Sequence, residues 1–423
     1  MQKIFAAALF SMLAISIPSG PAPSSSQSSA SRKAPLPQVR IVGYYASWDA
    51  HRGHFADAIR GELLTHVNYA FAKISDEGTA VLGDSCLDVG DCLPERGETA
   101  PSPGGNFAHL HRLKESYPHL QILIAIGGWT WSENFSNVAL TPNSRERFVA
   151  SALELFLDRW PGLFDGFDLD WEYPVAGGRA ENTYRPDDWE NYALLIAEFR
   201  RQLDRRSVAD GRGYLLTIAA PAVPQGANVG WSRIGAHVNW INLMTYDYHT
   251  GGNIAHFNAP LYAAPDDPTP HLNVHATVQR YLDAGVPREQ IAIGLPFFGQ
   301  GYGGVAATRE GLFQATQQDG LEDKNATQEW GIGAVPFRQL RDAHERSFRR
   351  FWHSEAQVPW LFNPERRVWI SYDDSQSLGL KSDYVRKHNL GGVMIWELGG
   401  DDGTLLEGVH RRLNSPGIDF PRH

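Results

Sequence analysis

From residue 39 onward, short runs of β-branched and aromatic residues alternate with longer stretches of helical periodicity. In 143–160, for example, Phe148, Ala152, Leu155 and Phe156 fall on one stripe, as in an amphipathic helix packed on a core. The short runs have the length and composition of buried strands. The predicted strands are 39–46, 65–72, 121–126, 166–172, 215–220, 238–246, 291–297 and 392–397.

Eight strands separated by helices predict an α/β protein with a parallel sheet. Closing that sheet gives a (β/α)8 TIM barrel and leaves no edge strand exposed. An open, doubly wound sheet is the alternative, but Gly43-Tyr44-Tyr45 in the first strand is not a glycine-rich phosphate turn. The interval 301–367 is too long for a loop and a helix, so we expect a small α+β insertion between strands seven and eight. The barrel then comprises 39–300 and 368–415.

The first 38 residues lack this alternation. Lys3 precedes an apolar run that ends at Ile17, which is the pattern of a signal peptide over about residues 1–20 and is short for a membrane span. Residues 21–38 are rich in Pro, Ser and Ala, and are predicted to form a disordered linker. We therefore expect a secreted protein, extracellular or periplasmic, with no membrane partner.

The two cysteines, Cys86 and Cys92, are expected to form one local disulfide in an exported protein, with two free thiols as the alternative. They have no nearby histidine pair, which disfavours a zinc site. The formal net charge of −10 argues against a polyanionic partner such as nucleic acid and fits a neutral substrate.

The candidate chemistry lies in the fourth strand, which reads Asp165-Gly-Phe-Asp168-Leu-Asp170-Trp-Glu172. Alternate side chains of a strand share a face, so Asp168, Asp170 and Glu172 are expected to project together. Carboxyls in such a row repel one another when ionised, so at least one should hold a proton near neutral pH, as a general acid requires. Glu172 comes last, at the carboxyl end of the strand, where barrel enzymes place their chemistry.

Two other interpretations of this strand remain. A solvated surface strand is disfavoured by Phe167, Leu169 and Trp171, which occupy the opposite face. A divalent-metal site is disfavoured because neighbouring strand ends supply few further carboxyl or imidazole ligands. Asp165 is out of phase with the other carboxyls, so it either precedes the regular strand or lies at a bulge.

This strand resembles the D-x-x-D-x-D-x-E signature of glycoside hydrolase family 18, the chitinases and their relatives. Weaker matches follow in order along residues 40–403. They include Val42-Gly43-Tyr44-Tyr45 with Trp48, His66-Val67-Asn68-Tyr69-Ala70-Phe71, Ile126-Gly127-Gly128-Trp129 with Ser132, Ala219-Ala220-Pro221-Ala222, Met244-Thr245-Tyr246-Asp247, Tyr372-Asp373-Asp374 and Gly391-Gly392-Val393-Met394-Ile395-Trp396-Glu397.

The resemblance implies a chitinase that hydrolyses β-1,4-N-acetylglucosamine linkages with retention, by substrate assistance and without a cofactor or metal. Glu172 would protonate the glycosidic oxygen and later act as the base for water. The nucleophile would be the carbonyl oxygen of the substrate's own acetamido group, which forms an oxazolinium intermediate. Asp170 would bond the acetamido N–H, Asp168 would share a proton with Asp170, and Tyr246 would bond the acetamido oxygen.

The same resemblance implies a set of substrate contacts for chitin or a chitooligosaccharide. Trp396 would form the floor beneath the distorted sugar. For the other positions, packing within the barrel is the competing interpretation; His249 and His256 are interpreted as loop histidines. We expect a monomer. The further residues expected to bind substrate are Trp129, Tyr44, Phe71, Met244, Asp247 and Asp165.

One departure from the family pattern affects substrate binding. Where many members have Tyr-Gly-Arg after the seventh strand, this chain has Phe298-Gly299-Gln300. The alternatives left open are an endo-β-N-acetylglucosaminidase acting on N-glycans or peptidoglycan, a chitin-binding lectin, and a metal-dependent barrel hydrolase. The presence of Glu172, Asp170 and Tyr246 argues for an enzyme over a lectin.

Overall fold

The computed structural model describes residues 39–90, 104–224, 229–317, 333–341 and 347–415. Residues from Val39 onward form one compact unit. The predicted signal peptide and linker lie outside the described residues, and so does Cys92. Cys86 is disulfide-bonded. Among the described residues, none of the helices has both the length and the apolar composition that crossing a membrane requires.

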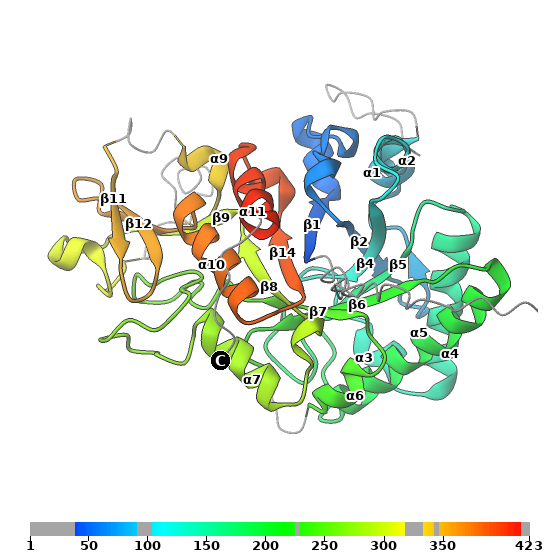
Figure 1. Ribbon diagram of the computed structural model, residues 1–423. Helices are drawn as coiled ribbons and strands as arrows, with labels where there is room; N and C mark the ends of the chain where they lie inside the picture. Colours follow the sequence, from blue (N-terminus) through cyan, green and yellow to red (C-terminus); the bar gives the residue numbers. More distant parts are fainter. Residues whose placement is uncertain (1–38, 91–103, 225–228, 318–332, 342–346, 416–423) are drawn as a thin grey trace, which may run out of the picture. The chain divides into compact units, whose positions relative to one another are not determined.

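Eight parallel strands close into a barrel in the described part of the chain, because the first strand, β1, pairs with both the second and the last. This confirms the predicted (β/α)8 barrel (Figure 1). A two-residue strand, β3 (Ala80–Val81), adds an antiparallel pair to β2. The barrel strands are β1 (Arg40–Ala46), β2 (His66–Ile74), β4 (Gln121–Gly127), β5 (Gly166–Asp170), β6 (Leu215–Pro221), β7 (Trp240–Met244), β8 (Ile291–Pro296) and β14 (Gly392–Trp396).

The two faces of each barrel strand enter different cores. On β5, Phe167 and Leu169 belong to the large hydrophobic core that also includes residues of the surrounding helices. The alternate residues Asp168 and Asp170 take the other face, toward the barrel interior. A smaller cluster fills this interior and includes Val42, Leu123, Ala125, Ala292 and Met394. The barrel interior is thus filled by side chains, and these include the buried polar residues Asp168, Thr217 and Asn242.

Helices follow most strands and lie outside the barrel (Figure 1). Two of them begin with a reciprocal capping box: Thr141 with Ser144 at α4, and Asp374 with Ser377 at α10. The helices are α1 (Ser85–Val89), α2 (Gly105–Ser116), α3 (Phe135–Ala139), α4 (Pro142–Leu153), α5 (Asp188–Asp210), α6 (Trp231–Gly235), α7 (Val274–Asp283), α10 (Ser375–Lys387) and α11 (Thr404–Asn414).

A second sheet lies between β8 and β14 in sequence, where the insertion was predicted. Within the described residues it has five antiparallel strands in the order β10-β9-β13-β12-β11, and one short helix, α9 (Phe337–Leu340). It exceeds the predicted interval 301–367 at both ends, because β9 begins almost directly after β8 ends and β13 continues to Ser371. Its strands are β9 (Phe298–Tyr302), β10 (Gly333–Pro336), β11 (Arg349–His353), β12 (Val358–Asn363) and β13 (Val368–Ser371).

The inserted sheet shares a core with the segment that follows β7. Ala255 and Phe257 from that segment pack with Trp360 of β12 and Trp369 of β13. The ring centroids of Phe257 and Trp369 are 6.0 Å apart. The insertion is therefore tied to the barrel through the segment that leaves the carboxyl end of β7.

Candidate active site

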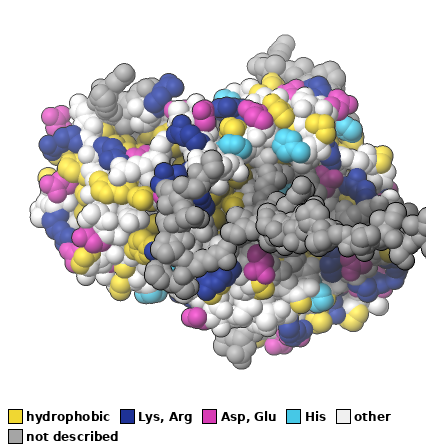
Figure 2. All heavy atoms as spheres, in the orientation of Figure 1, with side chains coloured by type: hydrophobic (Ala, Val, Ile, Leu, Met, Phe, Trp, Pro, Cys, Tyr) yellow, Lys and Arg dark blue, Asp and Glu magenta, His cyan; other side chains and the backbone are white. Residues whose placement is uncertain are grey.

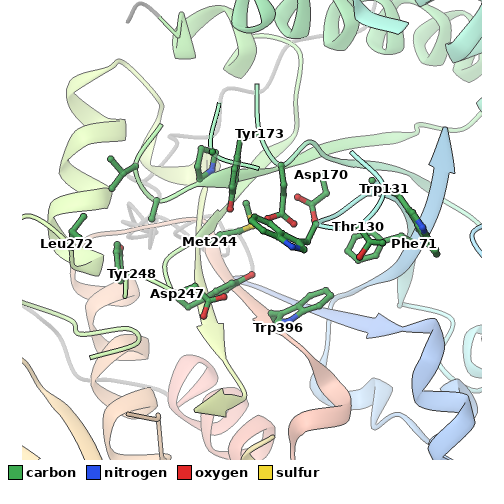
Figure 3. Close-up of a pocket in the computed structure, with 18 of the residues that line it drawn as sticks. Phe71, Thr130, Trp131, Asp170, Tyr173, Met244, Asp247, Tyr248, Leu272 and Trp396 are labelled. Atoms are coloured by element: carbon green, nitrogen blue, oxygen red, sulfur yellow. The ribbon is translucent and has the colours of Figure 1, made fainter. Parts of the chain in front are cut away.

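A cavity of about 840 Å³ opens at the carboxyl ends of the barrel strands. Figure 3 shows several of its lining residues, among them Asp170, Met244, Asp247 and Trp396. A position at this end of the barrel is where enzymes of this architecture carry out catalysis. Six strands contribute a residue from near their carboxyl ends, namely Phe71 (β2), Gly127 (β4), Asp170 (β5), Pro221 (β6), Met244 (β7) and Trp396 (β14).

Asp168 lies below the cavity, fully buried in the barrel. Its carboxylate accepts hydrogen bonds from the Tyr44 hydroxyl at 2.5 Å, from the Asn242 amide at 3.1 Å and from the Thr217 hydroxyl. Burial raises the pKa of Asp168, and these donors act against the rise because they favour the ionised form. The barrel thus provides the Asp168 carboxylate with three hydrogen-bond donors.

Asp170, the last residue of β5, is buried and lines the cavity. Its pKa is raised well above the ordinary value by burial first, and then by the charges of Glu172 and Asp168. Among the described residues, its Oδ1 atom has no hydrogen-bond partner. Asp168 thus has three donors that favour its ionised form, whereas the raised pKa of Asp170 favours its protonated form.

Glu172 follows the end of β5, where the predicted strand 166–172 proves two residues too long. Its backbone N–H donates to Ser132 Oγ at 2.9 Å, and its carbonyl accepts from the Asn182 amide at 2.7 Å. Burial raises the pKa of its side chain to about 7, with a further contribution from the charge of Asp247, while a hydrogen bond with Tyr173 lowers it. A carboxyl with this pKa can donate or accept a proton near neutral pH.

The turn after β4 holds the end of β5 through two glycines. Gly127 has φ of 108°, and a Cβ built there would lie 2.3 Å from the carbonyl oxygen of Asp170. Gly128 donates its N–H to that same oxygen at 2.8 Å. Only glycine allows this conformation with so close an approach, so the Gly-Gly pair fixes where Asp170 and Glu172 stand.

Tyr246 and Asp247 come from the segment after β7, two strands along the barrel from β5, and line the cavity. Burial and the charge of Asp170 raise the pKa of Tyr246 well above its ordinary value, so its hydroxyl keeps its proton. The hydroxyl contacts Met394 Sδ at 3.8 Å, which is a weak hydrogen bond. Asp247 accepts a hydrogen bond from Gln300 at 2.8 Å, and burial raises its pKa to about 6.

Aromatic side chains form the remaining surface of the cavity. The Trp396 ring stacks against Phe71 with centroids 5.8 Å apart, and meets Trp48 edge-on at 6.3 Å. Trp129 is 52% exposed at the cavity, which is unusual for so large an apolar side chain. Flat apolar faces with a polar centre suit a ligand that has both apolar faces and polar edges, as a sugar ring does.

The structure brings together most of the residues predicted from the sequence. Glu172, Asp170, Tyr246, Trp396, Trp129, Phe71, Met244 and Asp247 all line the one cavity.

Two expectations about substrate contacts need correction. Asp165 directly precedes β5, away from the cavity, and its carboxylate binds Lys114 at 2.5 Å and Arg212 at 2.9 Å. Its position before the strand places it at the amino end of the barrel, so it holds structure there. Tyr44 does not line the cavity. Its ring is buried beneath Trp396, and its hydroxyl donates a hydrogen bond to Asp168.

Several cavity residues were missed from the sequence. Trp131 and Tyr173 line the wall, and so does Tyr248. Tyr173 directly follows the catalytic candidate Glu172 and Tyr248 follows Asp247, a predicted substrate contact, and this adjacency was the one signal available. Ser132 was noted only as part of a motif, although it holds the backbone of Glu172. His249 and His256 stack on each other at 3.4 Å and do not line the cavity, as loop histidines would.

Within the described residues, no group of three or more His, Cys, Asp or Glu side chains is arranged to hold a metal ion. Asp168 and Asp170 share one face of β5 and Glu172 follows its end, but Asp168 is enclosed by three protein donors. The arrangement therefore resembles a proton-transfer site rather than an ion cage.

Comparison with known proteins agrees with this geometry. The chain is 38% identical over 412 residues to Chitinase A1 of Niallia circulans, covering 87% of this chain and 57% of that protein. It thus spans a little over half the length of that relative. The structure resembles Chitinase ChiA74 from Bacillus thuringiensis, with a TM-score of 0.81 and 33% identity over 89% of this chain and 70% of that one.

A second solved structure, a glycoside hydrolase family 18 N-acetylglucosaminidase from Paenibacillus barengoltzii, matches with a TM-score of 0.73 and 30% identity, covering 89% of this chain and 100% of that one. The model of the glycosyl hydrolases family 18 matches residues 40–401, which include the whole barrel and the inserted sheet. The chain belongs to glycosyl hydrolases family 18.

Proposed function

We propose that this protein is a chitinase, which hydrolyses β-1,4 linkages between N-acetylglucosamine units with retention of anomeric configuration. The relatives named above as chitinases support chitin as the substrate. The apolar run that ends at Ile17 supports export to the chitin. The nucleophile is the acetamido oxygen of the substrate, and the intermediate is an oxazolinium ion.

The observation that carries this proposal is the unpartnered Oδ1 atom of Asp170 in the cavity wall. A buried acceptor without a donor costs about 1–3 kcal/mol, so this atom favours a ligand that brings an N–H group. Tyr246 offers a hydroxyl whose partner, Met394 Sδ, is a weak acceptor. An acetamido group satisfies both, because its N–H can bond Asp170 while its carbonyl oxygen accepts from Tyr246.

Glu172 then supplies the proton transfers. In its protonated form it donates to the glycosidic oxygen, and the bond from that oxygen to the anomeric carbon breaks as the acetamido oxygen attacks the same carbon. The resulting carboxylate takes a proton from a water molecule, which opens the oxazolinium ring from the face that the leaving group left. Two inversions at one carbon give net retention.

The state of Asp170 supports a nucleophile from the substrate. Burial and the charges of Glu172 and Asp168 raise its pKa, which favours the protonated form, and a protonated carboxyl is a poor nucleophile. Asp168 lies below the cavity, so it is not placed to reach the anomeric carbon. The role of Asp170 is to orient the acetamido group, and the Asp168 carboxylate beneath it supplies negative charge that stabilises the positive charge developing there.

A pair of matched substrates tests this proposal. Chitin hexasaccharide and cellohexaose share the β-1,4-linked backbone, but cellohexaose has a hydroxyl in place of each acetamido group. We expect the protein to cleave the first and leave the second intact, since only the first carries its nucleophile. Cleavage of both at similar rates would overturn substrate assistance, and cleavage of neither would overturn the chitinase assignment.

A further inference from the structure

Asp247 is a cavity residue whose backbone conformation needs outside support. It has φ of 55°, in the left-handed region that residues other than glycine seldom adopt. Its backbone N–H donates to Asn258 Oδ1 at 2.9 Å. The N–H of Asn258 in turn donates at 2.8 Å to Ser371 Oγ, on β13 of the inserted sheet. One line of hydrogen bonds therefore runs from the inserted sheet to the backbone of Asp247.

The side chain of Asp247 is held by the same sheet. Gln300 lies on β9, is only 9% exposed, and donates from Nε2 to Asp247 Oδ1 at 2.8 Å. Gln300 and Ser371 are register partners on the adjacent strands β9 and β13. Two neighbouring positions of the insertion thus fix both the backbone and the carboxylate of one cavity residue.

The groups that surround Asp247 leave its charge uncompensated. Two carboxyls, Asp170 and Glu172, face the cavity from β5 and the residues after it. The other titratable groups around it are phenols and one imidazole, and none of the described lining residues is a lysine or an arginine. Gln300 is itself neutral. The phenols around Asp247 and Glu172 are Tyr173, Tyr246, Tyr248 and Tyr302, and the imidazole in the cavity wall is His271.

We propose that Gln300 is a positioning residue, which holds the Asp247 carboxylate in the cavity near Glu172 from the inserted sheet and, being uncharged, leaves the negative charge of Asp247 to act on Glu172. The hydrogen bonds described above support the positioning of Asp247 by Gln300. The effect of this positioning on catalysis rests on the proposed function of Glu172. A cation at position 300 would neutralise Asp247 instead.

The electrostatics agree with this geometry. Burial raises the pKa of Asp247 to about 6, and the hydrogen bond from Gln300 limits that rise. The charge of Asp247 in turn raises the pKa of Glu172. With a neutral donor, the inserted sheet thus extends the pH range over which Glu172 holds its proton.

The test is a carboxyl titration of the full-length protein, followed by infrared spectroscopy. Each spectrum is recorded against the same protein carrying Asp247→Asn, which assigns the Asp247 band without any substrate. Gln300→Met is of similar size and removes the donor, so the Asp247 midpoint should rise above about 6. Gln300→Arg supplies an opposite charge, so the midpoint should fall by about one pH unit or more. Gln317 is exposed, so Gln317→Arg is the control for added charge. It should change the titration midpoint of neither Asp247 nor Glu172.

The titration midpoint of Glu172 is measured in the same way, from spectra recorded against the same protein carrying Glu172→Gln. The titration midpoint of Glu172 should fall in Gln300→Arg, because the arginine neutralises the charge of Asp247 that raises it. The pH at which hydrolysis declines on the alkaline side should then fall by a similar amount. An unchanged Asp247 midpoint in both Gln300 variants, with both folded, overturns the proposal. Because the spectra need no turnover, a wild-type protein that titrates as expected but cleaves no chitooligosaccharide overturns the proposed function and leaves this inference standing.

Discussion

At the scale of single residues, the protonation of Glu172 governs the pH dependence of the proposed reaction. Burial raises its pKa to about 7. The first chemical step uses the protonated form, so kcat/KM should fall about tenfold per pH unit once the pH rises above that pKa. The measurement is a pH profile of kcat/KM on chitin hexasaccharide. A profile that stays level for two pH units above neutrality would contradict the assignment of Glu172 as the acid.

Ser132 is the residue whose removal should separate catalysis from binding. Its hydroxyl oxygen accepts the Glu172 N–H at 2.9 Å and is fully buried. Ser132→Ala leaves that N–H without its acceptor and frees the backbone of Glu172. We expect kcat to fall about ten- to a hundredfold with KM nearly unchanged, because a misplacement of about 1 Å is enough for such a loss.

Ser136→Ala is the matched control for this variant. Ser136 is also fully buried, and it bonds Asp188 at 2.7 Å, but it does not line the cavity. Both variants should lower the free energy of unfolding by a similar amount, about 1–3 kcal/mol. Equal losses of kcat in the two would show that Ser132 acts only through stability.

The residues of the site could be predicted from the sequence only where one strand carries them. Asp168, Asp170 and Glu172 share a face by alternation alone, and their grouping needed no tertiary contact. Asp165 and Tyr44 were misplaced because their partners, Lys114 and the buried Asp168 carboxylate, come from distant segments. The bond between Gln300 and Asp247 joins positions 53 apart, which no local pattern reports.

At the scale of elements, a buried ion pair fixes the return of the chain from the inserted sheet to the barrel. Asp373 follows β13, and its carboxylate binds Lys381 of α10 at 2.7 Å, with both side chains almost fully buried. Burial raises the pKa of Asp373 and lowers that of Lys381, and each charge opposes the effect on the other. Lys381→Met should lower the free energy of unfolding by about 3–5 kcal/mol, since it leaves an uncompensated buried charge.

Chemical denaturation measures that loss, and a double variant checks its cause. Lys381→Met with Asp373→Leu removes both charges, so it should recover most of the stability that the single variant loses. Arg412→Met breaks the exposed pair with Asp383 and should cost little. If the double variant is as unstable as the single one, lost packing rather than the buried charge is responsible.

The elements themselves followed from periodicity, with errors at their ends. The predicted strand 166–172 ends at Asp170, because the Glu172 N–H bonds the Ser132 side chain and not a neighbouring strand. The predicted strand 238–246 shortens to β7 (Trp240–Met244), after which the chain turns into the cavity wall. The ends of barrel strands hold the functional residues. There the geometry of the site, rather than the local sequence pattern, determines where a strand stops.

At the scale of the whole molecule, the barrel was predictable because eight buried strands connected by helices can form a closed parallel barrel that leaves no edge strand. The inserted sheet was predicted as an interval without its strand order, since antiparallel pairing between distant segments leaves little trace in sequence. On the face in Figure 2, acidic and basic side chains are interspersed, so the formal net charge of −10 does not gather into one patch there.

The measurement that tests the central claim most directly is hydrolysis of chitin hexasaccharide by the wild type and by Glu172→Gln, with the product anomers followed by NMR at early times. We predict that the wild type releases the β-anomer first, and that Glu172→Gln keeps its fold and loses nearly all turnover. First release of the α-anomer would contradict retention through an oxazolinium ion. Undiminished turnover by Glu172→Gln would contradict the assignment of this residue as the general acid.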